Sequence, residues 1–412
     1  MMTGEPDAFD IVIVGAGLAG LTLARALSVC GPELFRIAVV ERGAVSGAAS
    51  DARAFAIAAG PRRMLERLGI WRHIADVGEP VTTIDIADPD PRSPLRQTLL
   101  HYDNIITGDE PATHIVEHHD IKRAVVTEAR GDSAITLIEG AAIRSWTREP
   151  GTLALDLGDR GTLATRLLVG ADGRRSRVRD LAGIKTVGWG YGQRGIVTTV
   201  AHERPHGGRA MQHFFPAGPF AILPLKGNRS SLVWSEEAGE ARRIMALDDA
   251  EFLVELRQRF GEMLGEVTLE GERASWPLEM HLARRFVADR VALVGDSAHG
   301  AHPIAGQGLN IGLRDVAALS ETLIEARRLG LDIGSGTGLE RYERWRRFDS
   351  TVSAFSYDAI NRLFSNANPV LRAARDFGLG LVDRSATLKD FFVREAAGLN
   401  GELPKLLRGE PI

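Results

Sequence analysis

Residues 291–315 read VALVGDSAHGAHPIAGQGLNIGLRD, and this stretch decides the fold of the chain. Residues 291–294 form a short apolar run typical of a buried strand, Gly295 and Asp296 end it, and a helical pattern begins near Gly308. A carboxylate at the carboxyl end of a buried strand lies where α/β sheets bind ligands, and it can accept from sugar or polyol hydroxyls. The stretch therefore predicts a strand, a loop and a helix, with Asp296 as a candidate ligand-binding residue.

The loop after Asp296 can let a flat ring lie against the backbone. Pro303 precedes Gly306, Gln307 and Gly308 at the helix start, where free N–H groups and the helix dipole favour negative charge. Glycine has no Cβ, so a planar ligand can approach closely. A reduced isoalloxazine ring, which is anionic along its N1–C2=O edge, fits this description. Considered alone, the same residues also fit an ordinary capping turn.

Length and composition describe an ordinary soluble enzyme. The chain has 412 residues, which corresponds to roughly two domains at ~150 residues each. Hydrophobic residues make up 44%, charged residues 25%, and the net charge is −4, so general attraction to nucleic acid is not expected. An apolar run of about 18 residues and a basic leader are both missing, so we expect neither a transmembrane helix nor a signal peptide. The single cysteine argues against a disulfide or a structural zinc site, and we expect a cytoplasmic location and no metal.

A second ligand signature opens the chain. The apolar run 9–14 leads directly into GAGLAG, a helical pattern follows, and a second apolar strand at 37–40 ends in an acid. In a βαβ unit of this spacing, a pyrophosphate lies on the helix N-terminus and the carboxylate binds the adenosine ribose. The agreement of all four elements favours a nucleotide site over a simple glycine turn. The candidate residues are Gly15, Ala16, Gly17, Gly20, Glu41 and Arg42.

A third strand ends in the same way. The run 163–169 meets Gly170-Ala171-Asp172-Gly173, so three strand ends place glycines and polar groups at one sheet edge, and we expect them to converge on one ligand. Arg53 lies downstream of the second strand. It can pair bidentately with a pyrophosphate or be a solvated surface residue, and both interpretations stay open on its chemistry alone.

The regions outside these strand ends differ in character. Residues 191–275 alternate strands and tight turns, which predicts an antiparallel sheet inserted into the nucleotide-binding part. Its aromatic residues are expected to pack in a core, although one face could floor an apolar pocket. They are Phe214, Phe215, Phe220 and Trp234. Amphipathic helices are predicted at 339–364, 369–381 and 386–397.

The last stretch of the chain carries basic residues among leucines. They are Lys389, Arg394, Lys405 and Arg408. The pattern fits a membrane-surface or partner patch, but its modest amphipathicity favours a tail that docks on the protein itself.

The three strand ends resemble the three fingerprints of the single-component FAD aromatic hydroxylases, the para-hydroxybenzoate hydroxylase superfamily. Within it, several stretches are similar to the ubiquinone-biosynthesis hydroxylases of the UbiH, UbiF and Coq6 type, and the resemblance covers essentially the whole chain. These stretches are DARAFAIA (51–58), YGQ (191–193), GPFAILPL (218–225), SLVW (231–234) and HPIAGQGLNIGLRD (302–315).

Together, pattern and resemblance predict an α/β fold with three parts. A Rossmann-like FAD-binding domain comprises residues 1–80, 113–190 and 276–330. An inserted antiparallel β-sheet substrate domain comprises 81–112 and 191–275, and a helical C-terminal region comprises 331–412.

The resemblance also assigns roles to matching residues. It implies that Gly15, Gly17, Gly20 and Glu41 hold the ADP half of FAD and that Arg53 binds the pyrophosphate. It implies that Asp172 helps to orient FAD and supports nicotinamide use, and that Asp296 binds the ribityl chain. His118 stands where relatives often carry Asn or Arg, so no FAD contact is carried over to it. The residues expected to face the flavin ring are Pro303, Gly306, Gln307, Gly308, Leu309 and Asn310.

The implied chemistry is hydroxylation of an electron-rich phenol, a lipophilic ubiquinone precursor. NAD(P)H reduces the flavin, O₂ adds at C4a, and the resulting hydroperoxide transfers one oxygen atom, while the protein supplies position and desolvation. His213 and His281 could act as bases by residue type, but a hydrogen-bonded structural role is expected for each, so no base is assigned.

Other interpretations remain open. A flavin-dependent reductase or dehydrogenase of a lipophilic substrate would share the FAD fingerprints, and so would a non-catalytic FAD-containing subunit of a biosynthetic complex. The C-terminal region could contact other ubiquinone-biosynthesis proteins or the inner face of a membrane.

Overall fold

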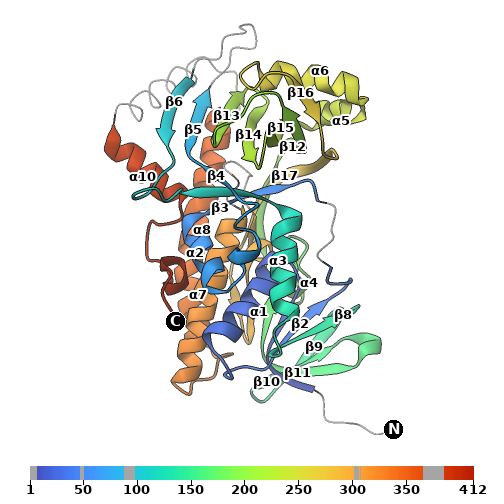
Figure 1. Ribbon diagram of the computed structural model, residues 1–412. Coiled ribbons are helices and arrows are strands. Elements are labelled where there is room, and N and C mark those ends of the chain that lie inside the picture. The colour runs from blue at the N-terminus through green and yellow to red at the C-terminus, as the bar shows by residue number, and fades with distance from the viewer. Residues whose placement is uncertain (1–6, 47–50, 88–97, 301–305, 307, 365–384) are drawn as a thin grey trace.

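Three sheets are stacked along the length of the molecule (Figure 1). The computed structural model describes residues 7–46, 51–87, 98–300, 306, 308–364 and 385–412. An eight-stranded sheet lies at the end that holds the N-terminus, a nine-stranded sheet lies at the other end, and a three-stranded sheet lies between them. None of the helices in the described part of the chain combines the length and apolar character needed to span a bilayer.

The eight-stranded sheet has the order β18-β19-β11-β1-β2-β8. Neighbours from β19 to β8 are parallel, and the antiparallel strands β9 and β10 extend from β11. Val14 pairs with Gly170, and Gly170 pairs with Leu293, so the predicted convergence of three strand ends at one edge is confirmed. The strands are β1 (Asp7–Val14), β2 (Ile37–Glu41), β8 (Ile135–Glu139), β9 (Ser145–Glu149), β10 (Thr152–Asp156), β11 (Thr162–Gly170), β18 (Val287–Ala288) and β19 (Val291–Leu293).

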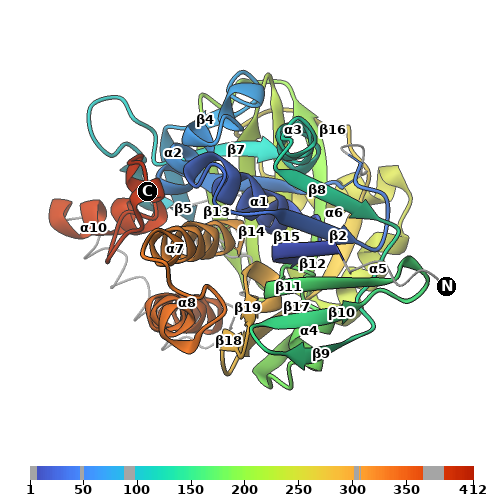
Figure 2. The same cartoon turned by 90° about the horizontal axis from the view of Figure 1, so that it is seen from below.

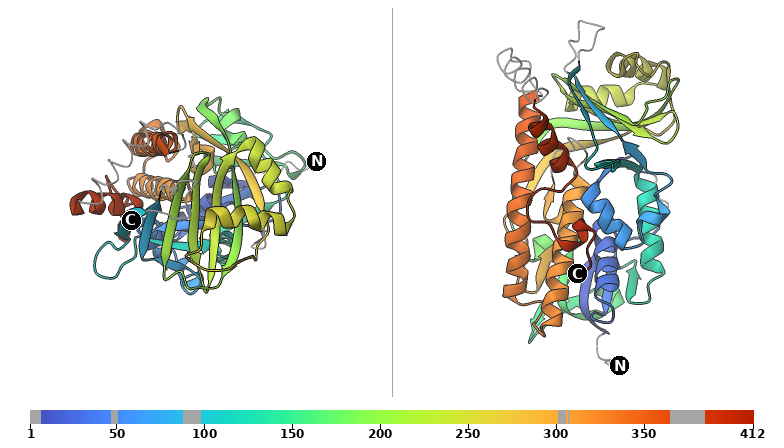
Figure 3. Two further views of the ribbon diagram at one scale, coloured as in Figure 1. Left: turned by 90° about the horizontal axis from the view of Figure 1, so that it is seen from above. Right: turned by 60° about the vertical axis from the view of Figure 1, so that its left-hand side comes forward.

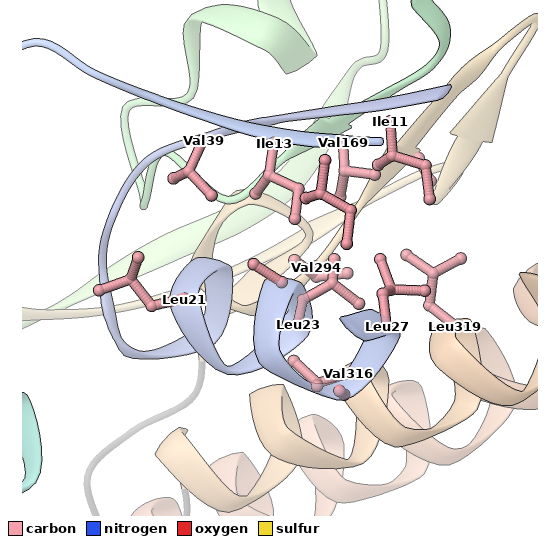
Figure 4. Close-up of a cluster of buried hydrophobic side chains, with 14 of the residues drawn as sticks. Ile11, Ile13, Leu21, Leu23, Leu27, Val39, Val169, Val294, Val316 and Leu319 are labelled. Atoms are coloured by element: carbon pink, nitrogen blue, oxygen red, sulfur yellow. The ribbon is translucent and has the colours of Figure 1, made fainter. Parts of the chain in front are cut away.

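The main hydrophobic core lies between this sheet and its helices. Figure 4 shows side chains of the sheet and of α7 gathered around those of α1, because the β-branched and leucine residues of each element face the same layer. Outside α7 runs the long helix α8 (Figure 2). The helices are α1 (Leu18–Cys30), α3 (His118–Arg130), α4 (Arg177–Leu181), α7 (Gly308–Arg328) and α8 (Gly336–Phe364).

The nine-stranded sheet is largely antiparallel, as the alternating pattern predicts, with β5 and β13 as a parallel pair. It extends from Thr186 to Ala283 in this part of the chain, a little beyond the predicted 191–275, because β17 pairs over its length with residues 186–197 of β12. The strands are β5 (Thr83–Ala87), β6 (Thr98–Asp103), β12 (Thr186–His202), β13 (Arg209–Phe215), β14 (Gly218–Leu225), β15 (Arg229–Glu237), β16 (Val267–Leu269), β17 (Ala274–Ala283) and β20 (His299–Gly300).

Most of the aromatic residues singled out in this sheet lie on its outer face, which α5 and α6 cover. Phe220 and Trp234 are buried in a cluster with α5 (Ala238–Ala246) and α6 (Asp249–Phe260), and Phe215 packs against the same cluster. The core-packing interpretation is thus confirmed for these three, and the idea that they floor a pocket is wrong. Side chains alternate along a strand, so Phe214 points to the opposite face, which looks toward the other two sheets.

The end of the chain packs on the protein itself. Leu406 and Leu407 are fully buried in the main core, so the docking-tail interpretation of the last stretch is confirmed. Lys405 pairs with Glu325, and Arg408 pairs with Glu410. The predicted helix 369–381 lies outside the described residues. The elements are β3 (Ala54–Ala58), β4 (Glu79–Val81), β7 (Thr113–Glu117), α2 (Ala59–Arg67) and α10 (Ala386–Ala396).

Candidate active site

Three glycines form the turn after β1, and they differ in the space around each Cα. A Cβ at Gly15, where φ is 105°, would clash with the backbone of Ala171. A Cβ at Gly20 would clash with the carbonyl of Gly15. A Cβ at Gly17 would meet nothing within 4 Å. Gly15 and Gly20 therefore close the turn, while Gly17 leaves room for a ligand to approach the backbone.

The N-terminus of α1 faces that open space. Gly17 is the N-cap and supplies no side-chain hydrogen bond, and the first turn carries no acidic residue. Free N–H groups and the helix dipole favour an anion there. Glu41 lies beside this turn, where it accepts from the N–H groups of Ala16 at 2.8 Å and Gly43 at 3.2 Å. The adjacent Arg42 is exposed.

Asp172 is already engaged by its own loop. Its carboxylate accepts from the Ser176 hydroxyl and from the N–H groups of Arg177 at 2.7 Å and Val178 at 3.1 Å. It therefore satisfies donors at the start of α4 and fixes the loop after β11. A direct contact between Asp172 and a cofactor stays a prediction.

Asp296 is the free carboxylate at the sheet edge. It is exposed in a short 3-10 turn, Gly295–Ser297, and among the described residues no donor is hydrogen-bonded to its side chain. Its backbone carbonyl accepts from His281 Nε2 at 2.9 Å. The turn is anchored, so the carboxylate is held in place and available for a hydroxyl donor.

A buried ion cluster holds this turn against the helices. Asp315 of α7 accepts from the Gly295 N–H at 2.9 Å, from His299 Nε2 at 2.6 Å and from Arg346 Nε of α8 at 2.8 Å. Burial alone would raise the pKa of Asp315, but the charges and hydrogen bonds of His299 and Arg346 outweigh it and lower the pKa. Arg346 also pairs with Asp349. The sequence analysis did not identify this cluster.

The start of α7 is open toward the same edge. A Cβ at Gly308 would meet nothing within 4 Å, and Leu309 is half-buried. The Asn310 side chain accepts from the Ala58 N–H at 3.0 Å and donates to the Ala56 carbonyl at 2.7 Å. Asn310 thus ties the helix to β3, which leaves its backbone as the part that can face a ring. Pro303 and Gln307 lie outside the described residues.

Arg53 lies in the segment before β3, close to this edge. It pairs with Asp51 through two nitrogens and lies over the rings of Phe55 and Trp276 at 5.5 and 5.3 Å. Burial lowers the pKa of Arg53, but Asp51 and the charge of Asp296 raise it overall. Arg53 is therefore a fixed cation near Asp296, and its predicted contact with a pyrophosphate would compete with Asp51.

The two candidate bases differ in position. His213 stacks on Phe220 and its Nδ1 contacts the Arg259 carbonyl at 3.2 Å, so it belongs to the outer core. His281 lies at the strand-end edge, where burial lowers its pKa. Its Nδ1 is buried without a partner among the described residues. A structural role is confirmed for His213, and the geometry assigns no base.

The geometry fits FAD on several independent points. The open face of Gly17 suits a pyrophosphate, Glu41 suits a ribose, the free Asp296 carboxylate suits ribityl hydroxyls, and the open N-terminus at Gly308 suits a flavin ring. A parallel sheet with this edge, facing a second sheet, is the arrangement of a flavoprotein monooxygenase.

Comparison with known proteins agrees. The FAD binding domain family matches residues 8–349. The p-nitrophenol 4-monooxygenase PnpA of Pseudomonas putida DLL-E4 has the same fold, with a TM-score of 0.79 over 96% of this chain and 99% of that one at 20% identity. Ubiquinone hydroxylase UbiL of Rhodospirillum rubrum is 44% identical over all of this chain and 95% of its own. The 3-demethoxyubiquinol 3-hydroxylase of Escherichia coli K12 is 32% identical over 97% of this chain and 100% of its own.

The chain therefore belongs to the ubiquinone-biosynthesis hydroxylase family of FAD-dependent monooxygenases. The predicted fold class, FAD cofactor and enzyme class are confirmed.

Gly17→Val tests the pyrophosphate site without disturbing the fold, because the added side chain enters open space. We expect it to weaken FAD binding at least about tenfold. Asp296→Ala should weaken it roughly tenfold to hundredfold, as expected for loss of a charged acceptor. The control is Gly239→Val in α5, where a Cβ is also unobstructed. Fluorescence titration of each apoprotein with FAD gives the affinities. Affinities equal to that of the wild type for both Gly17→Val and Asp296→Ala would refute the assignment.

Arg53→Ala should weaken FAD binding more than Arg174→Ala does. Arg174 pairs at 3.3 Å with Glu279, and both side chains are substantially exposed, so its loss should change affinity by no more than about fivefold. A charge-assisted contact from Arg53 to a pyrophosphate would be worth roughly 1.5–3 kcal/mol. Titrations of the two apoproteins, with thermal unfolding measured alongside, decide the matter. Equal affinities would return Arg53 to the role of an ion-pair partner for Asp51.

Proposed function

We propose that the protein hydroxylates the aromatic ring of a lipophilic phenolic ubiquinone precursor, with NAD(P)H as electron donor and O₂ as the oxygen source. The observation that carries the proposal is the composition of one face of the nine-stranded sheet. This inner face, which is directed toward the edge proposed to bind FAD, is largely apolar and carries a few buried neutral polar atoms. The printed names of the relatives UbiL and 3-demethoxyubiquinol 3-hydroxylase support the substrate class.

Strand alternation identifies the residues on this inner face. Ala210 of β13 and Leu225 of β14 cluster with Ala56 and Ile115 of the three-stranded sheet, so their side of the sheet is the inner one. Gln212 is two residues from Ala210 and pairs with Ala221. Ser231 of β15 pairs with Leu223, which also packs on the inner cluster. Residues paired directly across strands share a face, so Gln212, Ser231 and Ser235 all belong to the inner face.

These three polar side chains have unused hydrogen-bonding atoms. Gln212 Nε2, Ser231 Oγ and Ser235 Oγ are buried without a partner in the described part of the chain. A buried polar atom without a partner costs stability, so its retention suits contact with a bound molecule. Strand spacing of ~4.8 Å and rise of ~3.3 Å per residue place Gln212 roughly 12 Å from Ser231. An aromatic ring with oxygen substituents can bridge such donors.

The rest of the central inner face is uncharged. Phe214, Ala221, Leu223 and Val233 surround the polar side chains. A substrate with a carboxylate would need a cation there, whereas an apolar phenol needs desolvation and a few hydrogen bonds. Bound FAD supplies reactivity toward NAD(P)H and O₂. The chain positions the ring, excludes water and holds the ring oxygens through neutral donors.

The same site supports the division into an FAD-binding region (1–80, 113–190, 276–330) and a substrate region (81–112, 191–275), which we retain as a proposal. Leu406 and Leu407 of the tail are buried and therefore unsuited to membrane contact. Contacts with other ubiquinone-biosynthesis proteins or with a membrane would therefore use other surfaces of the C-terminal region.

Turnover with labelled O₂ and a short-chain prenyl phenol tests the proposed reaction. We expect one labelled atom in the product of the wild type. Gln212→Leu should raise KM or lower kcat by about twofold to tenfold, the worth of one neutral hydrogen bond, and release more hydrogen peroxide. Ser230→Ala is the control, because its hydroxyl lies on the other face against His202 at 3.1 Å. A reduced or dehydrogenated product without label would instead indicate a reductase or dehydrogenase, and absent turnover with bound FAD would indicate a non-catalytic subunit.

A further inference from the structure

Lys122 extends from α3 to the glycine turn that follows β1. Helix α3 lies beside α1, on the side of the molecule away from α8 (Figure 3). The Lys122 Nζ donates a hydrogen bond to the carbonyl of Ala16 in this turn. The next residue, Arg123, points outward, since its side chain is 62% exposed and pairs with Asp120. The helix therefore directs one of two adjacent basic residues to the edge that is proposed to bind FAD.

Lys122 is a half-buried cation without an ion pair in the described part of the chain. An ammonium group can donate three hydrogen bonds, and among the described residues only the Ala16 carbonyl accepts one from Lys122. Burial lowers the pKa of Lys122, and the charge of Glu41 counteracts this effect in part. The Glu41 carboxylate is itself held by the N–H groups of Ala16 and Gly43. A half-buried cation that keeps donors in reserve suits contact with an anionic ligand.

The position of the ammonium group indicates which part of the cofactor it can reach. It contacts Ala16, in the turn proposed to hold the pyrophosphate, and it senses the charge of Glu41, the acid proposed to bind the adenosine ribose. The space beside Gly17 in the same turn is open. A pyrophosphate is strongly anionic, and the dipole of α1 compensates only part of a unit charge. A nearby ammonium group would supply the compensation that the helix does not.

The neighbouring basic groups are less suited to this role. His118 lies one helical turn before Lys122, and its Nδ1 is 3.3 Å from the Asp51 carboxylate. Burial lowers the pKa of His118, and the charges of Arg53 and Lys122 lower it further against the effect of Asp51, so the ring is neutral at neutral pH. Arg53 is already paired with Asp51. Of the two charged groups, Arg53 and Lys122, only Lys122 has no carboxylate partner among the described residues.

We propose that Lys122 binds the pyrophosphate of FAD beside the adenosine ribose. The ammonium group keeps its hydrogen bond to the Ala16 carbonyl and donates a second one to a phosphate oxygen. The proposal rests on the assignment of the glycine turn to the pyrophosphate and adds a side chain on a separate helix to that site. Lys122 thereby favours FAD over flavins that lack the ADP half.

Fluorescence titration of apoproteins with FAD tests the role of the charge. Lys122→Met should bind FAD about tenfold more weakly, as expected for loss of a charge-assisted hydrogen bond. Lys122→Gln should be weakened by a similar factor, because it retains a donor for the Ala16 carbonyl but loses the charge. Arg123→Met is the matched control on the same helix and should bind FAD as the wild type does. Thermal unfolding of each apoprotein identifies a temperature at which all the variants are folded.

Protection of the Lys122 amine from an acylating reagent gives a second readout. Mass spectrometry of the peptides measures the labelling of each lysine in the wild-type apoprotein. Saturating FAD or ADP should reduce labelling of Lys122 several-fold, whereas riboflavin, which has no phosphate, should not. Lys185, which is exposed just before β12, is the internal control and should be labelled equally in all samples.

Two results would overturn the proposal. FAD affinity of Lys122→Gln equal to that of the wild type would leave Lys122 as an anchor of the glycine turn. Labelling of Lys122 that FAD does not reduce would place the amine outside the cofactor site. If Gly17→Val weakens FAD binding and both Lys122 variants do not, the pyrophosphate site stands without Lys122. Both readouts are independent of the labelled-oxygen assay, because they require no turnover.

Discussion

The Asp315 carboxylate is the interaction on which the site depends. It lies fully buried in α7 and joins the turn that carries Asp296, the short strand at His299 and Arg346 of α8. Burying these charges is costly, and removing one partner of such a cluster typically costs about 3–5 kcal/mol. The cluster therefore fixes one arrangement of loop and helices. Below the folded pKa of Asp315, which His299 and Arg346 lower against the effect of burial, this contribution to stability is lost.

Local sequence predicted the parts of the site that depend on chain-adjacent geometry. The run into GAGLAG, the acid at 41 and the Gly295-Asp296 pair each follow a buried strand, so strand pairing alone brings them to one edge. What the sequence could not reveal depends on contacts across the fold. Asp315 and Arg346 are 31 residues apart on separate helices, and no periodicity links them. A position of Asp172 and Asn310 near the cofactor stays a prediction, and the sequence did not reveal that the first caps a loop and the second ties α7 to β3. The sequence also could not tell which face of the antiparallel sheet its aromatic residues occupy, because that depends on the side covered by α5 and α6.

The two large sheets divide the work of an FAD-dependent monooxygenase. The parallel sheet places backbone N–H groups, the Glu41 carboxylate and the Asp296 carboxylate at one edge, where we propose that the cofactor binds. The antiparallel sheet presents a mostly apolar inner face with a few neutral polar atoms that have no partner in the described part of the chain. Helix α8 connects the two sheets, because Tyr342 donates to the Leu293 carbonyl of β19 and Asn361 donates to Gln193 of β12.

The FAD affinity of Asp315→Asn apoprotein tests the central claim most directly. The substitution keeps the shape of the side chain but leaves Arg346 buried beside a neutral amide, and it lies in α7 rather than among the residues assigned to the cofactor. If the cluster positions the Asp296 turn and the start of α7, FAD should bind at least about tenfold more weakly at a temperature where the variant remains folded. FAD affinity equal to that of the wild type in a folded variant would contradict the account.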